Sequence, residues 1–312
     1  MAIFHDGELQ VQRKVGIAES VSGFATRAIR DHMPDQHREF YTAQTMVMAG
    51  ILDATGQPWA SPIVGSAGFI SSPNATTLAI NAKPVIEYSG NVDVSRQQKL
   101  GLLGIELATR RRNRVNGVVT ETSAAGFTLS VDQSFGNCPK YIQKRSVSSE
   151  ANTHFAQDDF YPITVNAKET VAMLKQADTF FIASRSKALA NEPHTGADVS
   201  HRGGRPGFLK LDDNGNLIFP DFTGNNFFST LGNIVADPRV GLFIPNFVSG
   251  SAMWISGEAN ILWNPDQFGD FKGAQRFVEI KPTAILMSNK AVLAGGKDVE
   301  LSPKLSDTGI WT

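Results

Sequence analysis

The chain has 312 residues, of which 41% are hydrophobic and 28 are glycine, a composition that suits a globular protein with a substantial core. Its 29 Lys and Arg nearly balance 30 Asp and Glu, so the net charge of −1 excludes a general attraction to nucleic acid or membranes and leaves only local anion sites. One cysteine, Cys138, excludes an intrachain disulfide, and the sequence shows neither a signal-peptide pattern nor an apolar run that could span a bilayer, which together predict a cytoplasmic protein.

The predicted elements begin with a helix over 17–33, where apolar side chains recur on one face until Pro34. From Thr45 onward the pattern changes to short strand-like runs separated by turn-forming residues, at 45–52, 59–65, 76–80, 101–107 and 126–131. A linker at 146–154 is followed by a predicted helix over 165–177, and strand-like runs then resume. This order predicts a mainly β fold with peripheral helices.

The two halves of the chain match each other. Ser61 matches Ser200 and Phe69 matches Phe208 at a spacing of 139 residues, and Gly117 matches Gly257 after a slip of one residue. We infer two copies of one β unit, and small barrels placed side by side would protect the sheet edges. The predicted domains are an N-terminal helical segment (1–35), a first barrel unit (36–150) and a second barrel unit (151–312).

The copies differ in where they carry charge. Arg112-Asn113-Arg114 in the first copy corresponds to Ala252-Met253-Trp254 in the second, whereas His201-Arg202-Gly203 in the second corresponds to Pro62-Ile63-Val64 in the first. One composite site between the barrels would produce this pattern, and so would two exposed strand ends. The repeat alone leaves both interpretations open.

Two further features favour a composite site. In TGNNFFSTLGNIVADPRVG (223–241), a glycine-containing loop opens a predicted helix, and free N–H groups at a helix N-terminus bind phosphate well. The second feature is the set of arginines and glycines in 202–207. Arginine recognises phosphate and stacks on rings, while glycine lets a ring approach the main chain. The combination predicts a ligand with a phosphate and a flat body.

The segments SHRGGRPGF (200–208), FPD (219–221), GNN (224–226) and FGNCPKYIQ (135–143) together resemble the pyridoxamine 5′-phosphate oxidase-like FMN-binding split-barrel family, in particular its larger tandem members. The resemblance implies tandem split β-barrels, FMN as a noncovalent cofactor and a homodimer. It assigns the flavin ring to Ser200, His201, Arg202 and Gly203 with Asp221 beside it, and the phosphate to Asn225 and Asn226 with help from Lys140 and Arg111 or Arg112.

The resulting expectation is an FMN-dependent oxidoreductase that transfers hydride through the flavin to or from an unassigned small-molecule substrate. Residues 276–290 lack the R-x-H pattern of the authentic oxidases, which argues against pyridoxamine phosphate as that substrate. The alternatives are a non-catalytic carrier of FMN or haem and a dimerisation module whose site has decayed. No catalytic residue can be selected, the six scattered histidines do not suggest a metal site, and the basic run at 96–114 lacks the interleaved aromatics of a nucleic-acid binder.

Overall fold

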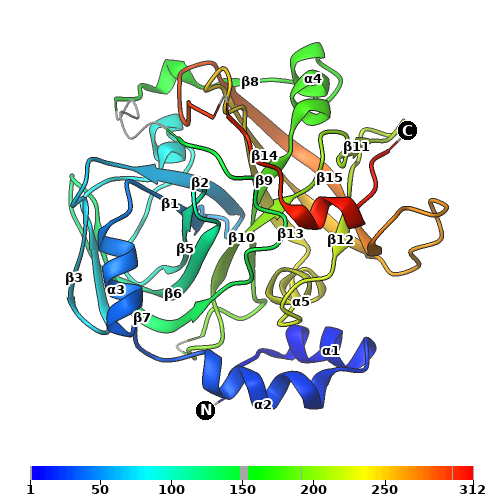
Figure 1. Ribbon diagram of the computed structural model, residues 1–312. Coiled ribbons are helices and arrows are strands. Elements are labelled where there is room, and N and C mark those ends of the chain that lie inside the picture. Colours follow the sequence, from blue (N-terminus) through cyan, green and yellow to red (C-terminus); the bar gives the residue numbers. More distant parts are fainter. Residues whose placement is uncertain (1, 148–153, 191, 297, 312) are drawn as a thin grey trace.

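The computed structural model describes residues 2–147, 154–190, 192–296 and 298–311, which form two antiparallel β-sheets flanked by short helices (Figure 1). The prediction of a mainly β fold with peripheral helices is confirmed. The predicted boundary at 150/151 and most of the predicted linker lie outside the described residues. None of the helices in the described part of the chain is long and apolar enough to cross a membrane.

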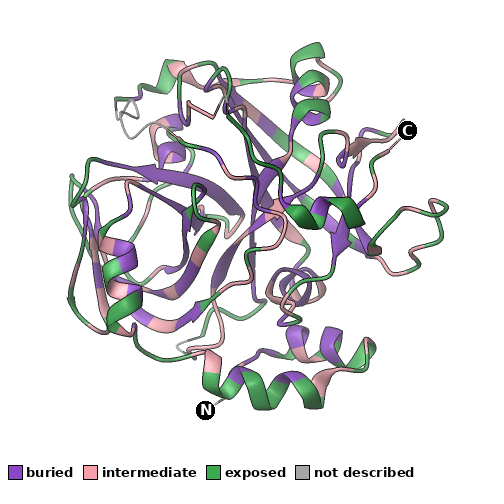
Figure 2. Ribbon diagram, viewed as in Figure 1, coloured by how far each residue is buried: buried purple, intermediate pink, exposed green. Residues whose placement is uncertain are grey.

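The first sheet has seven strands, which lie in the order β2-β1-β5-β6-β7-β4-β3. They are β1 (Met46–Leu52), β2 (Pro58–Val64), β3 (Ile70–Asn74), β4 (Thr77–Ile80), β5 (Lys99–Glu106), β6 (Arg111–Thr122) and β7 (Phe127–Gly136). Strands β1, β2 and nearly all of β5 are buried along their length, because side chains on both of their faces are covered (Figure 2).

The second sheet has the order β10-β9-β13-β14-β15-β12-β11, with β8 (Tyr161–Pro162) pairing alongside β15. Its strands are β9 (Thr179–Arg185), β10 (Ala197–Gly203), β11 (Lys210–Leu211), β12 (Leu217–Phe222), β13 (Arg239–Pro245), β14 (Ala252–Leu262) and β15 (Ala274–Ser288). If β8 is left aside and the strands of each sheet are numbered 1 to 7 along the chain, both sheets have the same order, 2-1-5-6-7-4-3. Both sheets also have a bulge at the matching position, Asn116/Gly117 in β6 and Ser256/Gly257 in β14.

The sheets pack directly on each other. A Cβ at Gly101 would press on the carbonyl oxygen of Ala197, and a Cβ at Gly241 would overlap that of Pro58, so β5 lies against β10 just as β13 lies against β2. The side chains of Phe181, Val199 and Phe243 belong to the core cluster of the first sheet. The halves therefore share a continuous apolar interface rather than a hinge.

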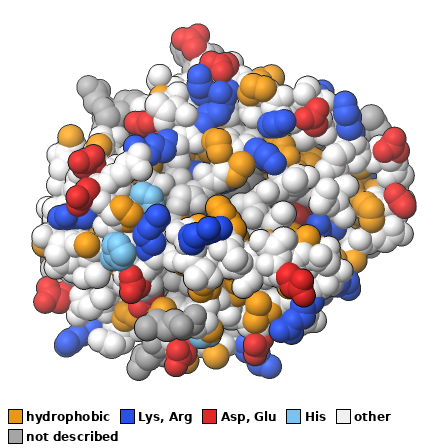
Figure 3. All heavy atoms as spheres, turned by 60° about the horizontal axis from the view of Figure 1, so that its bottom comes forward, with side chains coloured by type: hydrophobic (Ala, Val, Ile, Leu, Met, Phe, Trp, Pro, Cys, Tyr) orange, Lys and Arg blue, Asp and Glu red, His pale blue; other side chains and the backbone are white. Residues whose placement is uncertain are grey.

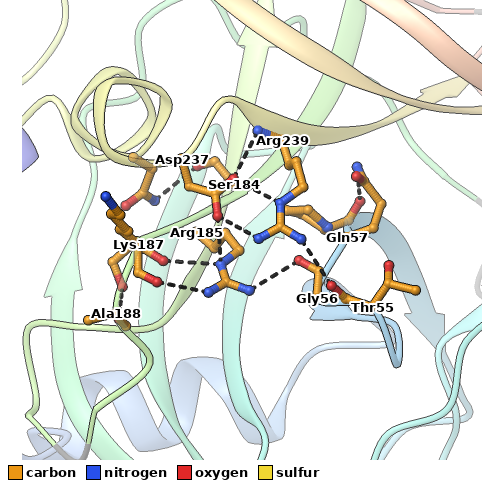
Figure 4. A network of polar contacts seen from close by, with 12 residues as sticks. Thr55, Gly56, Gln57, Ser184, Arg185, Lys187, Ala188, Asp237 and Arg239 are labelled. Carbon is orange, nitrogen blue, oxygen red and sulfur yellow. Dashed lines mark hydrogen bonds and ion pairs between the residues drawn. The ribbon is translucent and has the colours of Figure 1, made fainter.

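A polar network closes one edge of this interface (Figure 4). From the second sheet, Arg239 Nη1 donates to the carbonyl of Thr55 at 2.9 Å and Arg185 Nη1 to that of Gly56 at 3.3 Å. Asp237 holds both guanidiniums, at 2.6 Å from Arg239 Nη2 and 3.3 Å from Arg185 Nε. The β1–β2 turn is thus fixed to the second sheet.

The helices are α1 (Asp6–Lys14), α2 (Ala18–Ala28), α3 (Asp35–Thr42), α4 (Lys168–Gln176) and α5 (Ser229–Ala236), with short 3-10 turns η1 (Val85–Ser89), η2 (Gln157–Asp159) and η3 (Pro303–Asp307). The prediction of one helix over 17–33 is wrong at its end. The backbone of Arg30 leaves the helix and exchanges two hydrogen bonds with Ser134 of β7, and Pro34 begins α3 instead of ending α2. Tertiary pairing therefore overrides the helical pattern after Ala28.

Candidate functional site

The site begins with the alternation of side chains along β10. Asp198, Ser200 and Arg202 point to one side of the strand, while Val199 and His201 point to the other. Arg202 Nη1 forms an ion pair with Asp221 Oδ1 of β12 at 2.6 Å. Three polar side chains of the second sheet are therefore presented in a row, and the last is fixed by a carboxylate of a neighbouring strand.

Strand β6 of the first sheet meets this row from the opposite side. Arg114 Nη1 lies 2.9 Å from Asp198 Oδ1, and Arg114 Nη2 donates to the carbonyl of Val199 at 2.9 Å and to the hydroxyl of Ser200. Arg112 shares the face of Arg114, and its Nε donates to the carbonyl of Cys138 at 2.7 Å. The two charged segments from opposite copies thus meet at one place.

A cleft with a cavity volume of about 100 Å³ lies between these strands and the loop before α5. This volume is below the roughly 300 Å³ of an enclosed small-molecule site, so a larger ligand would extend out of the cleft. Seven of the predicted residues line it: Arg112, Ser200, His201, Arg202, Asp221, Asn225 and Asn226. They come from three separate parts of the chain, so the cleft exists only because the two sheets pack together.

Three predicted residues do not line the cleft. Arg111 points to the other face of β6, where Nη2 donates to the carbonyl of Gln36 at 3.0 Å and the guanidinium lies 4.6 Å from the Phe40 ring. Lys140 is half-buried on the segment after β7, outside the lining. Gly203 lies behind the cleft, where a Cβ would overlap the carbonyl oxygen of Tyr141. Of the two arginines left open, the structure brings Arg112 to the cleft.

The loop 223–228 and α5 form the far wall of the cleft. Asn226 and Phe228 both have the left-handed backbone conformation that side chains disfavour, with φ of 64° and 62°. Phe228 is the N-cap of α5, and no side chain caps the helix. The first N–H groups of α5 therefore remain available beside Ser229 and Thr230, which line the cleft, and such a terminus attracts anions.

The electrostatics of the cleft also favour an anion. Removal from water, together with the positive charges of Arg114 and Arg202, lowers the pKa of Arg112 to about 9. Arg114 and Arg202 each have an acidic partner, whereas Arg112 forms no ion pair within the described part of the chain. The positive charge is local, because acidic and basic side chains are interspersed over the face shown in Figure 3. A bound anion would offset the cost of this cluster.

His201 adds an unusual polar group on the other side of β10. Its ring is 5% exposed, and both ring nitrogens lack a hydrogen-bond partner. Burial, with the positive charges of Arg112, Arg145 and Arg202, lowers the pKa of His201 well below its usual range. The imidazole is therefore neutral and has one N–H and one lone pair unused.

Sequence reasoning missed several groups at the cleft. Arg114, Asn137 and Thr230 line it but were not selected, and Arg276 of β15 supports it by pairing with Asp221 Oδ2 at 3.4 Å. The period of two along a strand was a usable signal, because it groups Arg112 with Arg114 and separates them from Arg111. No comparable signal identifies Arg276, whose role depends on β12 and β15 lying side by side.

The equivalent position in the other copy is filled. Trp254 corresponds to Arg114, is fully buried, and lies 5.4 Å from the ring of Phe160. Ser61, which corresponds to Ser200, accepts a hydrogen bond from the backbone N–H of Ile86 at 3.0 Å. The two sheets therefore differ at this position, with a polar cleft on one side and a packed apolar contact on the other.

Comparisons with known proteins are weak. No family model matches the chain, and no curated protein matches it. Among solved structures, a putative pyridoxamine 5′-phosphate oxidase from Lactobacillus delbrueckii is 16% identical and has a TM-score of 0.30, covering 38% of this chain and 91% of that one. An FAD-binding protein from Mycobacterium smegmatis is 11% identical with a TM-score of 0.28, covering 40% and 94%. Since these values are low, a functional assignment depends on the site itself.

Proposed function

We propose that this protein is a tandem split-barrel flavoprotein that binds FMN in the cleft between β6 and β10 and acts as an oxidoreductase. One observation carries the proposal: arginines from opposite copies, Arg112 and Arg202, meet across a cleft that also contains the open N-terminus of α5. A phosphate and a flat ring are the two chemical features that these groups recognise together.

The unpartnered polar atoms of the site fit such a ligand. Arg112 and the N–H groups at the start of α5 would hold the phosphate, with Asn225 and Asn226 beside it. Arg202 Nε and Asn137 Nδ2 are buried without hydrogen-bond partners. These donors would bind the polar edge of the ring, whereas the His201 ring lies on the other face of β10, edge-on to Phe181. When bound, FMN supplies the capacity for hydride transfer, and a guanidinium near its carbonyl edge stabilises the reduced anion.

The test uses neighbouring residues of β6. Mass spectrometry of small molecules released on denaturation would identify a bound flavin, and quenching of flavin fluorescence would give the affinity of FMN. We expect Arg112→Met to weaken FMN binding by about tenfold or more, because it removes a charge-assisted contact. Arg111→Met is the matched control, since Arg111 faces away from the cleft, and its affinity should remain unchanged. Absence of flavin binding by the unaltered protein, or equal effects of both substitutions, would refute the proposal.

A non-catalytic flavin carrier is the second candidate. Asp221, the carboxylate at the cleft, is held between Arg202 and Arg276, which leaves it poorly placed to transfer a proton. Anaerobic addition of NADH or NADPH separates the two candidates. Bleaching of the flavin absorbance supports the oxidoreductase, and unchanged absorbance with each donor supports the carrier.

The homodimer, the cytoplasmic location, the small-molecule redox substrate and the domain limits 36–150 and 151–312 remain parts of this proposal. The cleft itself does not require a second chain, because β6 and β10 both belong to one chain. Sedimentation of the purified protein would show its oligomeric state.

A further inference from the structure

The N-terminal arm, defined as residues 2–29 with α1 and α2, packs behind the loop that forms the far wall of the cleft (Figure 1). Phe227 of this loop is 2% exposed and points into the arm. Its ring centroid lies 5.7 Å from that of Phe4 and 5.9 Å from that of Phe24. The adjacent residues Asn226 and Phe228 line the cleft. One side of the loop therefore faces the cleft and the other is held by the arm.

A buried hydrogen bond connects the arm to the same residue. Gln12 of α1 is fully buried, and its Nε2 donates to the carbonyl of Phe227 at 3.2 Å. This carbonyl lies between the two residues of left-handed conformation, Asn226 and Phe228. Strained conformations of this kind persist only where the surroundings fix them.

The backbones of α1 and α5 are in direct contact. A Cβ at Gly7 would overlap the carbonyl oxygen of Gly232, and a Cβ at Gly232 would press on the backbone of Glu8. Glu8 itself is buried and hydrogen-bonded by Ser229, the first residue of α5 and part of the cleft lining. The arm thus contacts the first turn of α5 as well as the loop before it.

We propose that α1 is a positioning element for the anion-binding wall of the cleft: by fixing Phe227 and the first turn of α5, it holds Asn226 and Phe228 in the conformation that exposes the helix N-terminus. The ligand part of this inference rests on the proposed function, whereas the structural part does not. Gln12 and Gly7 are positioning residues, because neither contacts the cleft.

Two substitutions separate this role from general stability. Gly7→Ala would push α1 away from α5, and Gly23→Ala is its matched control, because an added Cβ at Gly23 of α2 meets nothing within 4 Å. Gln12→Met removes the hydrogen bond to Phe227 with little change in volume, and it carries the test if Gly7→Ala does not fold. Hydrogen–deuterium exchange of the ligand-free full-length protein reports directly on residues 224–231.

We expect Gly7→Ala and Gln12→Met to speed exchange in 224–231 by about tenfold and to raise the dissociation constant of FMN by a similar factor, with no change in Gly23→Ala. Unchanged exchange at 224–231 in both variants would overturn the proposal, even if the arm itself exchanged faster. Faster exchange together with no FMN binding by the unaltered protein would support the positioning role and refute the flavin site. Unchanged exchange together with normal FMN binding would refute the positioning role and support the flavin site.

Discussion

Glu8 provides the sharpest prediction about the packing of the arm. Its carboxyl group is buried beside Asp198, and burial and this second carboxylate raise its pKa from 4.5 to about 8, although the N–H of His5, Ser229 and the charge of Arg114 partly offset the shift. In the unfolded chain Glu8 ionises near its ordinary pKa. The folded protein therefore binds one more proton than the unfolded chain between these two pKa values, and its stability falls as pH rises.

The magnitude follows from the shift. Each pKa unit corresponds to about 1.4 kcal/mol, so the change from 4.5 to about 8 amounts to at most roughly 5 kcal/mol. Glu8→Gln removes the titration while keeping a polar group of similar size. The free energy of unfolding of Glu8→Gln relative to the unaltered protein should therefore rise by about 1.4 kcal/mol per pH unit above pH 4.5 and level off above pH 8. Local undocking of α1 would lower the plateau and leave the direction unchanged.

Urea denaturation followed by tryptophan fluorescence, at a series of pH values between about 5 and 9, would measure this difference. Glu19→Gln is the control for the same chemical change, because Glu19 lies exposed on α2 and outside the contact between α1 and α5. If the profiles of Glu8→Gln and the unaltered protein ran parallel across this range, Glu8 would not be buried in its protonated form and the assigned packing of α1 on α5 would be refuted.

Three further predictions concern the site and the interface. Trp254→Ala should destabilise the protein by about 3–5 kcal/mol in urea denaturation, because a fully buried indole is removed, and a loss below 1 kcal/mol would contradict its packing. Arg114→Met should cost about 3 kcal/mol in the same assay, since Asp198 would lose its ion-pair partner and keep only the amide donors of Asn116 and Asn233, and an unchanged midpoint would contradict the pair. The affinity for FMN should fall as NaCl is raised, and fall less steeply in Arg112→Met; equal salt dependence in fluorescence titrations would argue against phosphate binding at Arg112.

The fold could be predicted where local pattern and local structure agree. The 139-residue match of Ser61 with Ser200 corresponds to β2 and β10, which occupy the same place in their sheets. Added Cβ atoms at Gly65 and Gly204 would overlap the rings of Phe69 and Phe208, so these matched pairs preserve one turn geometry in both copies. Repeated local constraints leave a repeated sequence, which can be recognised without a structure.

The remaining features depend on contacts between distant segments. The basic run containing Arg112 and Arg114 is strand β6, and its charges are tolerated inside the interface because Asp198 lies opposite, 84 residues further along the chain. Helix α1 was predicted only as part of the N-terminal helical segment 1–35, without bounds of its own, although its capping box of His5 and Glu8 is a local signal. The packing of α1 could not be predicted, because α1 packs on α5, which lies far along the chain.

The two sheets differ at corresponding positions, with a polar cleft on one side of their interface and an apolar contact on the other. If the two halves were symmetric, β6, which pairs with β5, and β14, which pairs with β13, would have the same surroundings. Both positions would then need the same polar groups. Here Arg114 meets Asp198 on one side, whereas Trp254 packs on Phe160 and Phe243 on the other. Apolar burial of a large ring is more stabilising than a paired buried charge. Within one chain, one of the two corresponding positions can therefore stabilise the fold while the other carries charge, and the proposed flavin site at the charged position predicts one FMN per chain.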